Sequence, residues 1–138
     1  MKNKYLGLNK VFSVDIPIYD IDLVVMVGND IPALKKQLEE LVKEDLRYKL
    51  DELWNQHDIS LQGYYTHNDP LKVIYMSETE DYHEFISVLS HEILHAVFNM
   101  AQYIGLKYSD KSEEAYTYLV GYITREIYKQ LDENTPST

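Results

Sequence analysis

His91-Glu92-Ile93-Leu94-His95 is the stretch of sequence that decides the fold and the site. An α-helix turns once in about 3.6 residues, so two imidazoles four positions apart lie on nearly the same face. Both rings can therefore bind a single metal ion from one rigid element. The Glu92 carboxylate is rotated by about 100° from His91, so it reaches a water at the metal rather than the metal itself. Two histidine ligands beside a carboxylate form the pattern of a catalytic zinc site with a general base.

The residues around this motif predict the helix that the motif requires. Neither proline nor glycine occurs between Asp81 and Ile104, and Gly105 stands where a helix-ending glycine is expected. A helix with two incidental histidines is the alternative interpretation. The expected helix also has apolar residues at spacings of three and four, namely Phe85, Ile86, Leu89, Ile93, Ala96, Val97 and Met100.

A second helix is expected to supply a third metal ligand, because catalytic zinc usually takes three protein ligands and one water. This helix is predicted over about 112–131, with Asp110 and Ser112 as candidate N-caps. The short polar connection makes the two helices neighbours, which can bring Glu113 or Glu114 toward the end of the first helix. Carboxylates in a first turn also favour the helix dipole, so this pair has an ordinary structural interpretation as well.

The arrangement resembles the gluzincin branch of the zinc metallopeptidases, in which a ligand glutamate follows the His-Glu-x-x-His helix on the next helix. The run Glu113-Glu114-Ala115-Tyr116 is similar to the Glu-Ala helix of ImmA/IrrE-type peptidases and of short phage-encoded metallopeptidases. The resemblance covers residues 80–130.

The resemblance implies one Zn²⁺ per chain held by His91, His95 and Glu114, because the family's ligand glutamate directly precedes the alanine. Thermolysin-like members carry an aspartate four residues after that glutamate, where this chain has Tyr118. A hydrogen bond to a zinc-bound histidine must then come from another side chain or from a backbone carbonyl. The implied activity is peptide-bond hydrolysis, in which Glu92 takes the proton of a zinc-bound water.

Hydrolysis also needs a donor that stabilises the oxyanion of the tetrahedral intermediate. His83 stands eight residues before His91 and falls on nearly the same helix face. Tyr118 lies one turn beyond the candidate ligand glutamates, and Tyr122 one turn further on. His83 and Tyr118 are therefore candidate catalytic residues beside Glu92, although most of the 13 tyrosines are expected to serve in packing.

Length and composition predict one globular domain. The 138 residues include 45% hydrophobic and 26% charged residues, which is enough to form a core. The absence of cysteine excludes disulfides, thiolate ligands and cysteine catalysis. A formal charge of −10 argues against nucleic acid and anionic membranes as partners. The resemblance to the metallopeptidases implies a protein or peptide substrate. With no recognisable signal peptide or apolar run of membrane-spanning length, a cytoplasmic protein is expected.

The remaining segments predict a small sheet and a further helix. Alternation over residues 11–27 indicates two strands, or one bent strand, broken near Pro17. A long amphipathic helix is predicted over about 31–54, and a hairpin around the Asn-Asp-Pro turn at 68–70. In gluzincins the strand before the active-site helix is the sheet edge that pairs with substrate, which implies this role for residues 71–76.

Together these predictions give an α+β fold, a minimal zincin-like domain over residues 1–133 followed by a disordered tail at 134–138. A small mixed or antiparallel sheet packs against the active-site helix, the long N-terminal helix and a C-terminal helix. Two other interpretations stay open: a catalytically silent module that contains zinc, and a metal-free interaction or regulatory module such as a phage accessory protein. A purely structural zinc site has no use for Glu92, which favours catalysis.

Overall fold

The chain begins with a β-hairpin made of β1 (Lys10–Ile16) and β2 (Ile21–Val27). The computed structural model describes residues 1–55 and 62–136. A single 3-10 turn, η1 (Pro17–Tyr19), separates the two strands, so the predicted break near Pro17 is confirmed. The proline suits the first position of such a turn because its ring already holds φ near the helical value.

A second hairpin joins β3 (Gly63–Asn68) to β4 (Leu71–Met76), as predicted. β4 also pairs with β2 in parallel, which gives a mixed sheet in the order β1-β2-β4-β3. The prediction that residues 71–76 form the sheet edge is therefore wrong. β4 is an inner strand that is buried along its whole length, as an apolar strand covered on both faces must be, and the edge beside it is β3.

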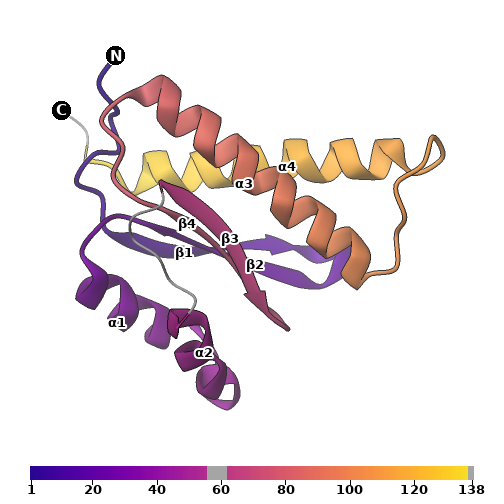
Figure 1. Cartoon of the computed structure of the whole chain (residues 1–138), viewed down its shortest axis with the longest axis horizontal. Helices are drawn as coiled ribbons and strands as arrows, with labels where there is room; N and C mark the ends of the chain where they lie inside the picture. The colour runs from indigo at the N-terminus through magenta and orange to yellow at the C-terminus, as the bar shows by residue number, and fades with distance from the viewer. Residues whose placement is uncertain (56–61, 137–138) are drawn as a thin grey trace.

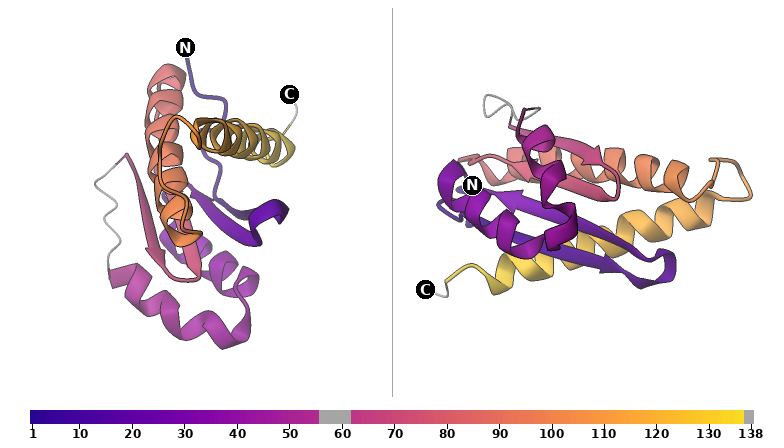
Figure 2. Two further views of the ribbon diagram at one scale, coloured as in Figure 1. Left: turned by 90° about the vertical axis from the view of Figure 1, so that its right-hand side faces the viewer. Right: turned by 90° about the horizontal axis from the view of Figure 1, so that it is seen from below.

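Helices cover both faces of this sheet (Figure 1). α3 (Tyr82–Tyr103) and α4 (Glu113–Glu133) lie on one face, and α1 (Ile31–Leu41) and α2 (Leu50–Asn55) lie on the other (Figure 2). The chain is thus an α+β fold with a sheet between two helical layers.

The alternation of the strands divides the apolar residues between two cores. In β4, Ile74 and Met76 join the core under α3 and α4, whereas Val73 and Tyr75 join the core under α1 and α2. The same alternation sends Lys72 toward α3.

The long helix predicted over 31–54 is wrong, because the segment is broken into three pieces. α1 ends at Leu41, Val42 is extended with φ −78° and ψ 136°, and the 3-10 segment η2 (Glu44–Lys49) leads into α2. An unbroken helix of about 24 residues would measure about 36 Å, against about 23 Å for a seven-residue strand. The break keeps the apolar residues of both halves over the sheet, namely Leu34, Leu38, Val42, Leu50 and Leu53.

α3 begins and ends at the residues that the sequence indicates. The Asp81 side chain caps the helix by accepting the backbone N–H of Glu84 at 2.9 Å. Gly105 follows the helix with φ 76°, and the Leu106 N–H donates to the Ala101 carbonyl at 2.7 Å. This is the Schellman arrangement, and it requires a residue that accepts positive φ, which is why glycine suits the position.

α4 also begins where predicted, at Glu113, with Ser112 in the N-cap position. The Ser112 hydroxyl bonds within the connection rather than to the helix: it donates to the Lys107 carbonyl and accepts the Ser109 N–H. At the other end, Asn134 and Thr135 hydrogen-bond back to the last turn of α4, and residues 137–138 of the predicted tail lie outside the described residues. Among the described helices, none is long and apolar enough to cross a membrane.

Candidate metal centre

The two histidines of the motif converge on one point beside α3. Their Nε2 atoms lie 3.0 Å apart, and the rings meet edge to face with centroids 4.7 Å apart. Two nitrogens that each lie about 2.0–2.1 Å from a tetrahedral zinc are separated by about 3.3 Å. The spacing of the His91 and His95 nitrogens is thus close to what one zinc ion requires, and both rings are exposed where an ion can reach them.

Glu92 lies beside the two histidines, but its side chain is only 8% exposed. Its Oε1 is 3.9 Å from Nε2 of His91. Burial raises the pKa of the Glu92 carboxyl, while the two histidines and the backbone N–H of Tyr65 oppose this shift. A carboxylate with a raised pKa accepts a proton more readily, which suits a general base.

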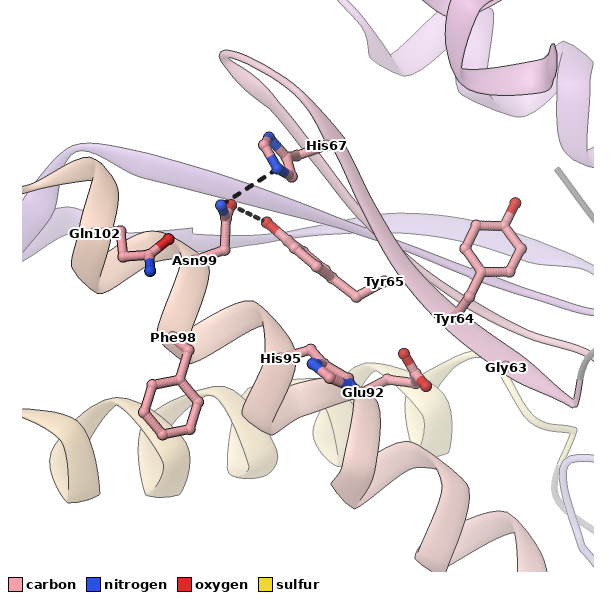
Figure 3. A pocket seen from close by; sticks show the side chains of 9 residues that line it. All are labelled: Gly63, Tyr64, Tyr65, His67, Glu92, His95, Phe98, Asn99 and Gln102. Atoms are coloured by element: carbon pink, nitrogen blue, oxygen red, sulfur yellow. Dashed lines mark hydrogen bonds between the residues drawn. The ribbon is translucent and has the colours of Figure 1, made fainter. Parts of the chain in front are cut away.

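A cleft of about 500 Å³ opens between α3 and β3 at the motif (Figure 3). Helix and strand approach closely at one end, because a Cβ on Gly63 would lie 2.8 Å from Cγ1 of Val88. Glycine at this position therefore lets the strand lie beside the motif. The cleft is lined by Gly63, Tyr64, Tyr65, His67, Glu92, His95, Phe98, Asn99 and Gln102.

In the part of the chain that the structure describes, the strand in this cleft, β3, is an edge strand, and no other strand pairs with its side away from β4. Asn68 and Leu71 pair next to the hairpin turn, and the Ser77 N–H donates to the Gln62 carbonyl at the other end of the ladder. Residues of an antiparallel ladder alternate between hydrogen-bonded and outward-facing pairs, so positions 63, 65 and 67 direct their main-chain groups away from β4. The Tyr65 N–H accordingly meets the Glu92 carboxylate in the cleft.

The structure does not bring the predicted third ligand to the two imidazoles. Glu113 and Glu114 both lie exposed in the first turn of α4. Over residues 1–55 and 62–136, no three His, Cys, Asp or Glu side chains gather closely enough to hold a metal ion. The two helices do meet nearby, since the Tyr116 ring of α4 lies 5.6 Å from the Phe98 ring of α3.

The other two candidate catalytic residues lie outside the cleft. His83 is exposed in the first turn of α3, with its ring 6.2 Å from that of Tyr82. Tyr118 is 52% exposed and stacks on Tyr122 with ring centroids 6.0 Å apart. Neither His83 nor Tyr118 lines the cleft, and their catalytic roles stay predictions.

Sequence reasoning missed the polar residues Tyr65, His67, Asn99 and Gln102 of this cleft. Asn99 could have been found, because it stands four residues after His95 and continues the stripe of the motif along the helix. The two β3 residues carry no such signal, because their position depends on which strand forms the sheet edge beside α3.

Comparison of the chain with protein-family models, with curated proteins and with solved structures finds no match.

Proposed function

We propose that the protein is a zinc-dependent peptidase of the gluzincin type. The observation that carries this proposal is the approach of the His91 and His95 Nε2 atoms to 3.0 Å beside the buried carboxyl of Glu92. Two imidazoles are a donor set that zinc prefers, and the nearby carboxyl has the raised pKa expected of a general base.

His91 and His95 would hold the ion, and Glu114 is the proposed third ligand. Zinc, when bound, supplies a Lewis acid that polarises a carbonyl and makes water more acidic. Glu114 is exposed in the first turn of α4, so its side chain must turn toward the imidazoles to complete the site. Glu113 is the alternative ligand from the same turn.

Glu92 acts in this proposal as the general base. Its carboxylate takes a proton from the water that attacks the peptide carbonyl and passes that proton to the leaving amine. Its burial disfavours the charged form and so increases the affinity of the carboxylate for the proton.

The position of β3 at the edge of the described sheet supports a peptide as the substrate. An extended peptide can add to an open sheet edge through main-chain hydrogen bonds. In this proposal β3 has the role that the resemblance to gluzincins implied for residues 71–76, because β3 is the strand that lines the cleft.

A catalytically silent interaction module is the second candidate function. It is favoured by one observation: in the part of the chain that the structure describes, no three ligand side chains converge. Such a module would bind zinc weakly or not at all.

Cleavage of a proteome-derived peptide library, read by mass spectrometry, tests the proposal. We expect zinc-loaded wild-type protein to cleave peptides and the Glu92→Gln variant to cleave them about 10²–10⁴-fold more slowly, as for the loss of a general base. Glutamine matches glutamate in size, so the comparison isolates the carboxylate. Equal cleavage by both proteins, or none by fully zinc-loaded wild type, would contradict the proposal.

A further inference from the structure

Four polar side chains, Lys72, Asp69, His67 and Asn99, form a closed ring. Two of them, His67 and Asn99, line the end of the cleft, one helical turn beyond His95 (Figure 3). Lys72 Nζ lies 2.7 Å from Asp69 Oδ1 and 3.4 Å from Asn99 Oδ1. Asn99 Nδ2 lies 3.3 Å from His67 Nε2, and His67 Nδ1 lies 3.3 Å from Asp69 Oδ1. The Tyr65 hydroxyl also contacts Asn99 Oδ1, at 2.5 Å.

The ring fixes the orientation of the Asn99 amide. A lysine ammonium can only donate hydrogen bonds, so the Asn99 atom that it faces must be the oxygen. The Tyr65 hydroxyl donates to the same oxygen. Asn99 Nδ2 therefore donates to Nε2 of His67, which leaves Nδ1 of His67 to donate to the Asp69 carboxylate.

Stability alone gives little reason for this ring. Lys72 is only 1% exposed, but the side chain of its partner Asp69 is 47% exposed, and an ion pair with a solvent-exposed partner contributes about 1 kcal/mol or less to stability. The ammonium also lies 4.2 Å from the centre of the Tyr103 ring. What Lys72 adds is a donor aimed at the Asn99 oxygen.

One N–H of Asn99 is left over. A side-chain amide carries two N–H donors, and the ring uses one of them. Among the described residues, His67 is the only acceptor that bonds to Asn99 Nδ2. Because Asn99 is half-buried and lines the cleft, its second N–H is available to a ligand there.

We propose that Asn99 binds a main-chain carbonyl of a peptide lying along β3, with Lys72 and Tyr65 as the positioning residues that hold its amide. This inference rests on the proposed peptidase function. It adds a requirement on the substrate, which must extend beyond the cleaved bond as far as Asn99.

The helix spacing matches this role. Asn99 lies four residues after His95, a rise of about 6 Å along the helix. In an extended peptide, carbonyls two residues apart face the same side at about 6.6–6.8 Å. A peptide with its cleaved carbonyl at His95 therefore places the carbonyl two residues away at Asn99. Dipeptides, which lack that carbonyl, should be poor substrates.

The test uses a peptide found to be cleaved in the library, together with two capped versions shortened on one side or the other. Each shortened version lacks the carbonyl two residues from the cleaved bond on its side. We expect Asn99→Ala to raise KM for the full peptide about threefold to tenfold, as for the loss of one hydrogen bond, with zinc content unchanged. For one of the two shortened peptides, wild type and variant should have the same KM.

Gln102→Ala is the matched control, because Gln102 lines the same cleft without taking part in the ring. Any change in KM that Gln102→Ala causes should be the same for the full peptide and for both shortened peptides, unlike the change caused by Asn99→Ala. Lys72→Met should raise KM for the full peptide as Asn99→Ala does, and should add no further increase when combined with Asn99→Ala, since both remove the same interaction.

An unchanged KM in Asn99→Ala, or the same rise for all three peptides, would overturn the role of Asn99 while leaving the peptidase function intact. A zinc-loaded wild type that cleaves no peptide would instead overturn the proposed function, and this inference with it.

Discussion

The two faces of the sheet are made by the same strands and both bury an apolar core, but among the described residues only the α3 face also buries charged side chains, Lys72 and Glu92. On the α1 and α2 face, Val73 of β4 joins an apolar core with Leu34 and Leu38. On the α3 face, Lys72 of the same strand lies in a polar ring, next to a cleft that contains the buried Glu92. We infer from this difference that the candidate site occupies the edge where α3 meets β3. The face covered by α1 and α2 contributes stability without contributing to the site.

The largest effect should come from the face without the site. Leu34 is fully buried, so Leu34→Ala should lower the free energy of unfolding by about 2–5 kcal/mol, measured by denaturant titration. Leu41→Ala on the same helix is the control, because Leu41 is 41% exposed and should cost about 0.5 kcal/mol or less. Zinc content should not change in either variant. If folded Leu34→Ala protein lost its zinc, the two faces would not be independent.

A smaller effect is expected from the polar ring, and it should depend on pH. The hydrogen bond from Lys72 holds the pKa of Asp69 below its ordinary value. The folded pKa of Asp69 lies below its unfolded value of about 3.9. The contribution of the charged Asp69 carboxylate to the free energy of unfolding is therefore present above about pH 4 and is lost as the pH falls through the folded pKa.

Asp69→Asn should therefore lower stability at pH 7 by at most about 1 kcal/mol, since the Asp69 side chain is 47% exposed and solvent screens the pair. Unfolding experiments from pH 7 to pH 3 should show that the difference in free energy of unfolding between wild type and variant becomes smaller as the pH falls. A gap that stayed constant with pH would mean that the charge of Asp69 is not what stabilises the ring.

The smallest effect is expected from the two candidate catalytic residues outside the cleft. Tyr118→Phe and His83→Ala should each change the rate of peptide cleavage less than twofold, because neither side chain lines the cleft. Rates on one library peptide, compared with wild type, provide the measurement. A loss of tenfold or more in Tyr118→Phe would assign the stabilisation of the oxyanion to Tyr118 and would require α4 to approach the site during catalysis.

Local signals in the sequence were enough to predict α3 and α4. Asp81 and Gly105 bound α3 through an N-cap and a Schellman turn, which are set by residues only a few positions apart. The prediction of one long helix over 31–54 was wrong because the apolar repeat continues through Val42. The break there fits the segment to the size of the sheet, which the local sequence does not reveal. A largely apolar run such as residues 71–76 is typical of an inner strand, but the edge was predicted for it on the resemblance to gluzincins.

The residues of the candidate site also divide into those that local sequence signals predict and those that tertiary packing places. Its helical residues, His91, Glu92 and His95, follow from spacing along one element, and Asn99 extends the same stripe. Tyr65 comes from a strand whose place beside α3 is decided by tertiary packing, so sequence periodicity does not reveal it. The position of Glu114 likewise depends on how α4 packs on α3, which the length of a connection does not determine.

Elemental analysis of bound zinc tests the central claim most directly, in wild type, His95→Ala, Glu92→Gln, Glu114→Gln and the matched control Glu113→Gln. We expect one zinc per chain in wild type, none in His95→Ala, a full complement in Glu92→Gln and Glu113→Gln, and a reduced amount in Glu114→Gln. This pattern would show that the two histidines hold the metal and that Glu92 has another role. Wild-type protein that binds no zinc, even when zinc is supplied in excess, would contradict the account and leave an interaction module.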